Sequence, residues 1–225
     1  CLFQLGHVED GITLCEEAIS MDPKCETAYF QLAEIMKYNK DPEAVISYYY
    51  KNLEENPESY LTYYNLGNYL KSLNSYNMAI KFFEKCISIN PNFIKAIFKK
   101  ADIFSKIGSH KKSIRILRSI IEVDNQNSDA FNLIGVELEK LNLNEEAKER
   151  FLDSIYLKPE NPEAYYNLGN NLIGSTDLVN GYECLQNHQN NNPFDNNRYL
   201  GLNNLMFIIQ NYLLKDKKYS IDFSF

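Results

Sequence analysis

Apolar residues recur along most of the chain at the three- and four-residue spacing that is typical of an amphipathic helix. Ile80, Phe83 and Ile87 show this spacing within one segment. Alternation of apolar and polar residues, which indicates a half-buried strand, is sustained only in the last seven residues. The pattern therefore predicts an all-α fold.

Prolines divide this helical pattern at a regular interval. Pro23, Pro57 and Pro91 stand 34 residues apart, and the interval from Pro159 to Pro193 is again 34. Because proline cannot continue the hydrogen-bond ladder of a helix and restricts the residue before it, each of these prolines marks the end of a helix. The period predicts five consecutive repeats, at residues 26–59, 60–93, 94–127, 128–161 and 162–195, with residues 1–25 as the C-terminal part of an incomplete repeat.

Three of these repeats share residue types at fixed positions. The second has Tyr63, Leu66, Gly67, Leu70, Ala79, Phe83 and Pro91, the fourth has Phe131, Ile134, Gly135, Leu138, Ala147, Phe151 and Pro159, and the fifth has Tyr165, Leu168, Gly169, Leu172, Leu185 and Pro193. These positions resemble the tetratricopeptide repeat, a helix–turn–helix motif with the pattern W-x2-L-G-x2-Y, then A-x3-F, then P. The resemblance implies a right-handed superhelical solenoid that is stabilised by contacts between neighbouring repeats.

Small residues such as Gly67 and Gly135 recur where the two helices of a repeat are expected to approach closely. The first repeat departs from this pattern at Val45 and Asn52, and the fifth departs from it at His188. His188 has two interpretations, a metal or proton site and the loosened packing of a terminal repeat. The second is favoured because terminal repeats are commonly atypical.

Residues 196–225 follow the last repeat. A helix at about 198–214 is predicted to cap the end of the fifth repeat, although its outer face carries Phe207, Ile208 and Leu214. Either the cap is imperfect, or the chain continues, or a further subunit covers this end. The alternating tail could add to a partner as a strand or pack back on its own surface. The start at Cys1, without an initiator Met, indicates a piece of a longer protein.

Composition and charge narrow the class of protein. With 44% hydrophobic residues and no apolar run of about 18 residues, we expect neither a disordered chain nor membrane insertion. A formal net charge of −7 argues against nucleic-acid binding. The five cysteines and three histidines are too scattered for a zinc site, so we expect reduced thiols, a cytoplasmic location and no metal or cofactor.

The resemblance also implies a binding surface. In such repeats the first helix lines a concave groove, and the fifth position here is aromatic in four of the five repeats. Aromatic side chains could grip a peptide segment or a partner helix, or they could pack within their own repeat. The candidate concave residues are Phe30, Tyr64, Asn65, Asn68, Lys95, Phe98, Lys99, Tyr166 and Asn167.

Some members of this family hold the terminal carboxylate of a partner in a clamp of lysines and asparagines. The clamp pattern is matched here at Asn65, Lys95 and Lys99. It is not matched at Phe30 and Glu34, and the negative charge of Glu34 would repel an incoming carboxylate. A clamp of this kind is therefore not expected.

Charge is distributed unevenly among the repeats. The second and third carry +2 and +5, whereas the first, fourth and fifth and residues 1–25 carry −4 each. In the third repeat, helical spacing places Lys111, Lys112, Arg115 and Arg118 on the outer, convex face. This basic patch is either a docking site for an acidic partner or an ordinary solvated surface.

Catalysis is not expected. The chain has no glycine-rich phosphate loop and no G-x-S-x-G or H-E-x-x-H motif. Its adjacent carboxylates are expected on exposed helix faces, where they lack an enclosing pocket: Glu16 with Glu17, Glu54 with Glu55, and Glu145 with Glu146.

The resemblance implies a non-enzymatic scaffold that binds protein partners within a larger assembly. Ciliary and microtubule-associated complexes are among those that use such arrays, which would place the chain in the cytoplasm, the cilium or the cytoskeleton. The alternative is the substrate-docking arm of a larger enzyme similar to an O-GlcNAc transferase.

Overall fold

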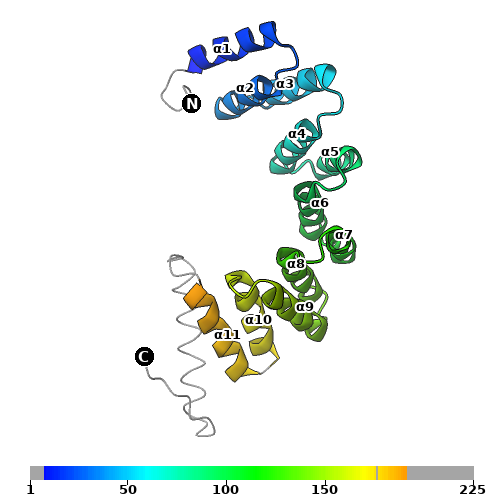
Figure 1. The fold of residues 1–225 in the computed structure, drawn as a ribbon, viewed down its shortest axis with the longest axis vertical. Helices are drawn as coiled ribbons and strands as arrows, with labels where there is room; N and C mark the ends of the chain where they lie inside the picture. Colours follow the sequence, from blue (N-terminus) through cyan, green and yellow to red (C-terminus); the bar gives the residue numbers. More distant parts are fainter. Residues whose placement is uncertain (1–7, 176, 192–225) are drawn as a thin grey trace. The chain divides into compact units, whose positions relative to one another are not determined.

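The computed structural model describes residues 8–175 and 177–191, and within them it contains eleven helices and no strand (Figure 1). The expected all-α helical repeat fold is thus confirmed. The predicted capping helix, the tail, Cys1 and the side chain of His188 lie outside the described part of the chain. The helices are α1 (Val8–Met21), α2 (Glu26–Tyr38), α3 (Pro42–Glu55), α4 (Tyr60–Ser72), α5 (Tyr76–Ile89), α6 (Ile94–Lys106), α7 (His110–Val123), α8 (Ser128–Glu139), α9 (Asn144–Leu157), α10 (Pro162–Gly174) and α11 (Leu178–Asn191).

The helices alternate in two series with the same 34-residue period. One series begins at residues 26, 60, 94, 128 and 162, and the other begins at residues 42, 76, 110, 144 and 178. Each first helix is followed by a short turn and then by its second helix, so the chain is a succession of helix–turn–helix pairs.

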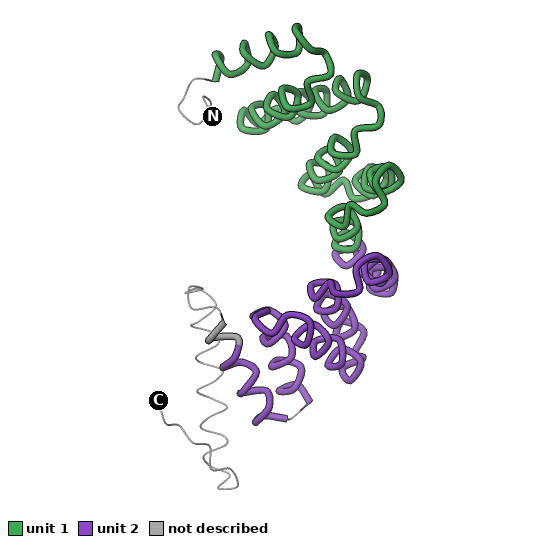
Figure 2. Tube along the Cα trace, viewed as in Figure 1, with its two compact units in different colours: residues 1–103 green, residues 104–225 purple. Residues whose placement is uncertain are grey.

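The chain forms two compact units, residues 1–103 and residues 104–225, which we call compact unit 1 and compact unit 2 (Figure 2). Helix α6 runs across the division between them. In compact unit 1, the side chains of Leu66, Phe83 and Cys86 are fully buried in one apolar core. In compact unit 2, Phe151 and Leu185 are fully buried in the same way.

Glycine permits the two helices of a repeat to approach closely. A Cβ atom added to Gly67 would lie 2.8 Å from the ring of Phe83, and one added to Gly135 would lie 2.5 Å from the ring of Phe151. Both distances are shorter than carbon atoms can approach without displacement. The recurrence of a small residue at this position therefore reflects direct contact between α4 and α5 and between α8 and α9.

The turn between the two helices of a repeat has the same backbone conformation in four repeats. The backbone is left-handed at Lys40, Asn74, Gly108 and Asn142, with φ of 59°, 58°, 74° and 60°. The residue after each of them donates its N–H to the carbonyl oxygen five residues earlier, as from Asp41 to Met36 at 3.0 Å. This is the Schellman arrangement that commonly ends helices, and glycine and asparagine tolerate it best.

We predict that Gly108→Ala lowers the free energy of unfolding by about 1 kcal/mol, because a side chain in the left-handed region is strained. No atom lies within 4 Å of the added Cβ, so the cost comes from the backbone alone. Gly174→Ala is the matched control, since that glycine ends α10 in equally open space without a left-handed backbone. Urea titration measures both variants, and an equal loss of stability in the two would contradict the prediction.

Candidate protein-interaction surface

The candidate concave residues lie on the first helices of the repeats. Compact unit 1 holds Phe30 on α2, Tyr64, Asn65 and Asn68 on α4, and Lys95, Phe98 and Lys99 on α6. Compact unit 2 holds Tyr166 and Asn167 on α10. The two groups are described separately below.

Two of the candidate aromatic residues pack in part against the core of compact unit 1. The ring centroid of Phe30 lies 6.3 Å from that of Tyr49. The ring of Tyr64 lies 6.0 Å from Phe83 and meets Phe93 edge-on at 5.0 Å. Both candidate side chains are half-buried. The interpretation that the fifth position packs within its own repeat thus applies in part to Phe30 and Tyr64.

The polar candidate residues of the same unit form no such contacts through their side-chain polar groups. Asn65, Asn68 and Lys99 are half-buried, and Lys95 is exposed. Within the described residues, the side chains of these four form neither a hydrogen bond nor an ion pair. Their amide groups and ammonium groups are therefore available to a ligand.

Asn167, in compact unit 2, is already bonded. Its Nδ2 donates to Oδ1 of Asn132 on α8 at 2.9 Å, and Asn132 is only 3% exposed. This hydrogen bond joins the first helices of the fourth and fifth repeats. Asn167 therefore has a structural role that the sequence pattern did not indicate, while its neighbour Tyr166 is half-buried.

Compact unit 2 contains a buried carboxylate that the sequence did not predict. The side chain of Glu137 on α8 is 5% exposed. Its Oε1 accepts hydrogen bonds from Ser105 Oγ at 2.6 Å and from Lys140 Nζ at 2.8 Å, and its Oε2 is hydrogen-bonded to His110 Nδ1 at 2.8 Å. Burial alone would raise the pKa of Glu137, but the bonds from Lys140, Ser105 and His110 outweigh it and hold this pKa below its ordinary value.

Glu137 is the tenth residue of its repeat, and the tenth residue joins neighbouring repeats elsewhere. In the fifth repeat, Nδ2 of Asn171 donates to Oε1 of Glu139 at 2.9 Å and to the carbonyl oxygen of Asn144 at 3.3 Å. In the second, the ring of Tyr69 lies 5.9 Å from the ammonium of Lys37. Each contact reaches the preceding repeat. Burial raises the pKa of Glu139, and the bond from Asn171 offsets part of this effect.

The structure explains why the first repeat carries Asn52 where a small residue was expected. Asn52 is fully buried. Its Nδ2 donates to Thr62 Oγ1 at 2.7 Å, and its Oδ1 accepts from Asn56 Nδ2 at 2.8 Å. A buried amide is tolerated when its hydrogen bonds are made, and the hydroxyl of Thr62 in the next repeat makes one of them.

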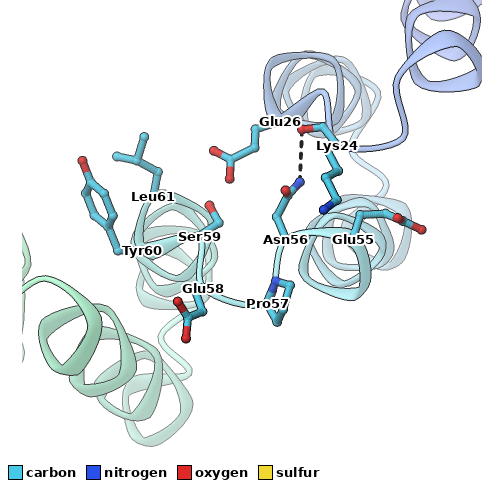
Figure 3. A pocket seen from close by; sticks show the side chains of 9 residues that line it. All are labelled: Lys24, Glu26, Glu55, Asn56, Pro57, Glu58, Ser59, Tyr60 and Leu61. Atoms are coloured by element: carbon cyan, nitrogen blue, oxygen red, sulfur yellow. Dashed lines mark hydrogen bonds between the residues drawn. The ribbon is translucent and has the colours of Figure 1, made fainter.

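An open hollow of about 380 Å³ lies where α3 leads into α4 (Figure 3). Its lining includes Lys24 and three carboxylates, those of Glu26, Glu55 and Glu58. Asn56 Nδ2 crosses it to the carbonyl oxygen of Lys24 at 3.2 Å, the dashed line of Figure 3. Since Glu55 and Glu58 are exposed, water solvates their charges, and this hollow is not an enclosed catalytic pocket.

The adjacent carboxylate pairs lie in no enclosed site. All six carboxylates of the adjacent pairs are exposed, as the sequence predicted: Glu16, Glu17, Glu54, Glu55, Glu145 and Glu146. In the described part of the chain, no three His, Cys, Asp or Glu side chains come together as metal ligands. None of the helices described is both long enough and apolar enough to cross a membrane.

The basic patch of α7 lies in compact unit 2, and all four of its residues are exposed. Lys111, Arg115 and Arg118 border one hollow. Lys112 is directed elsewhere, with its ammonium 5.6 Å from the ring centroid of Phe104. The structure thus separates one member of the patch from the other three.

Comparison with known protein families and structures identifies what this architecture is similar to. Sequence models of the tetratricopeptide repeat match residues 60–93 and residues 128–161, which are the ranges of the second and fourth predicted repeats. No curated protein matches the chain in sequence.

Several solved structures share the fold. MamA 41-end from Desulfovibrio magneticus RS-1 is 19% identical with a TM-score of 0.63, over 76% of this chain and 96% of that one. YrrB, described as a tetratricopeptide-repeat protein with an unusual peptide-binding site, is 20% identical with a TM-score of 0.58, over 80% and 93%. The pilF protein of Pseudomonas aeruginosa is 16% identical with a TM-score of 0.66, over 82% and 84%. At these identities the likeness concerns the fold.

Glu137 and Glu139 should give the stability opposite dependences on pH. A lowered folded-state pKa means that the contribution of Glu137 is present above the unfolded pKa, near 4.5, and is lost as the pH falls through the folded value. Glu137→Gln should therefore destabilise at pH 7, and its difference from the wild type should shrink below pH about 4.5. Urea titration at a series of pH values measures this difference.

Glu139→Gln is the matched control. Because the folded-state pKa of Glu139 is raised, ionising it opposes folding, so this variant should be at least as stable as the wild type at pH 7. Any gain should disappear as the pH falls and Glu139 of the wild type takes up its proton. A difference from the wild type that does not vary with pH in either variant would contradict the assignment.

Proposed function

Because this chain is a tetratricopeptide-repeat protein, we propose that it is a scaffold that binds a segment of a partner protein on the first helices of compact unit 1. The repeats and the structural neighbours support a protein-interaction role in general. The proposal is narrower, because it assigns binding to particular side chains of α4 and α6.

The observation that carries the proposal is the state of four polar side chains. Asn65, Asn68, Lys95 and Lys99 form no hydrogen bond or ion pair among the described residues. A side-chain amide can donate to and accept from the backbone of an extended peptide, and an ammonium can donate to its carbonyl or carboxylate oxygens. Together the four present donors and acceptors that the fold of compact unit 1 does not use.

Aromatic side chains add apolar contact to this surface. Tyr64 precedes Asn65 on α4, and Phe98 precedes Lys99 on α6. Both rings are half-buried, so each keeps part of its surface open to a ligand. Rigid rings of this kind provide contact area with little loss of conformational entropy on binding. The description of YrrB as a peptide-binding repeat protein supports a peptide as the ligand here as well.

We extend the proposal to a wider role. Arrays of this kind hold the parts of a larger assembly together, so we place the chain in such an assembly in the cytoplasm, the cilium or the cytoskeleton, without a catalytic function of its own. A further subunit at the C-terminal end is part of the same proposal. The second candidate is a substrate-docking arm of a larger enzyme, and the same surface would then receive the substrate.

The binding surface is tested with a random twelve-residue peptide library displayed on phage and selected on the wild-type chain. Selected peptides should bind Asn65→Ala/Asn68→Ala and Lys95→Ala/Lys99→Ala at least about tenfold more weakly, since each double substitution removes several hydrogen bonds. Fluorescence anisotropy measures the affinities.

Asn77→Ala and Lys81→Ala are the controls, because both residues are exposed on the second helix α5 of the same repeat. They should bind like the wild type. The proposal would be overturned by peptides that bind all variants equally, or by a selection that yields no binding peptide.

A further inference from the structure

Three of the four residues of the basic patch of α7 line a hollow of about 290 Å³ in compact unit 2. One wall is formed by Lys111, Arg115 and Arg118, which stand at helical spacing on one stripe of α7. The remaining lining is mostly aliphatic: Ile114, Leu138, Leu141 and Leu143, with Glu146. Leu143 is 40% exposed, so part of this apolar surface faces solvent.

The charges of the wall have no ion-pair partner in the described part of the chain. Among the described residues, Lys111, Arg115 and Arg118 form no ion pair with a carboxylate. Arg150, on the neighbouring helix α9, contrasts with them, because it pairs with Asp153 at 2.8 Å. The lining of the hollow therefore has three cations against the single carboxylate of Glu146, a net charge of +2.

A second hollow of about 230 Å³ adjoins the first and shares Arg118, Leu138 and Glu146 with it. The two extend along α7 past Ile121. The first is at the lower bound of the roughly 300–1,000 Å³ that is typical of small-molecule sites, and the second is below it. Their size and succession fit the side chains of a peptide better than a compact ligand.

We propose that this hollow docks an acidic peptide segment of a partner protein. An aliphatic or aromatic side chain of the peptide contacts the aliphatic lining of the hollow, and the flanking carboxylates of the peptide contact Lys111, Arg115 and Arg118. The positive charge of the wall favours an acidic segment, and the aliphatic lining favours an apolar residue between the acidic residues of that segment. This site is separate from the first-helix surface of compact unit 1, and it does not depend on the function proposed for that surface.

An array of synthetic peptides tests the proposal. Each peptide has two acidic residues on either side of one central position, which is varied through all residue types, and the full chain is applied with a fluorescent label. Peptides with Leu, Ile, Met or Phe at the centre should bind, and those with Ser, Asn or Lys should not. Binding that is independent of the central residue, or no binding at all, would overturn the proposal.

Charge variants locate the binding and exclude a general electrostatic effect. Arg115→Glu/Arg118→Glu should weaken binding of the best peptide at least about tenfold, because two contacts become repulsive. Lys112→Glu makes the same kind of change one residue away from the wall and should leave the affinity within about twofold of the wild type. An equal loss in Lys112→Glu would overturn the proposal.

Glu146→Gln supplies a readout of opposite sign. Removing the one carboxylate of the lining should tighten binding of the acidic peptide. A variant that had merely lost its fold could not bind more tightly, so this result separates docking from a structural effect. Unchanged or weaker binding by Glu146→Gln would contradict the assigned position of the peptide.

Discussion

The close contact of α4 with α5, and of α8 with α9, is the constraint on which the other features depend. It is clearest where Gly67 lies against Phe83 and where Gly135 lies against Phe151, because no other side chain fits at either glycine without displacement. This contact fixes which side of the first helix faces inward. On α4, Asn65 is two residues from Gly67, about 200° around the helix, and so it is directed away from α5. The candidate binding surface is therefore a consequence of the packing.

A second set of contacts joins one repeat to the next, and it differs in chemistry along the chain. At the tenth position, compact unit 1 uses the ring of Tyr69 against Lys37, whereas compact unit 2 uses the buried polar groups of Glu137 and Asn171. A buried carboxylate contributes stability only while its partners compensate for its lost hydration. The contact between the third and fourth repeats is therefore expected to respond to pH, while the ring contact in compact unit 1 depends on apolar area and a nearby cation.

The fold could be predicted from the sequence because its signals are local and periodic. Prolines and small residues at a 34-residue interval indicated paired helices. Asn74, Gly108 and Asn142 recur at the same interval and mark the turns between the paired helices, a second signal that the sequence contains. The polar contacts could not be predicted in the same way. Glu137 meets Ser105 across 32 residues, and neither residue type is distinctive alone. The only available hint was that the tenth position is apolar or aromatic in the first three repeats, as at Ile103, and polar in the last two.

A double-mutant cycle on Gly135 and Phe151 tests the central constraint most directly. The sequence offers an alternative combination, because the third repeat has Ala101 and Leu117 at the equivalent positions. Gly135→Ala and Phe151→Leu should each lower the free energy of unfolding, by about 1–3 kcal/mol for the first. If the helices meet at this contact, the double variant should be more stable than the sum of the two losses predicts, by at least about 1 kcal/mol. Losses that add within about 0.5 kcal/mol would contradict the account.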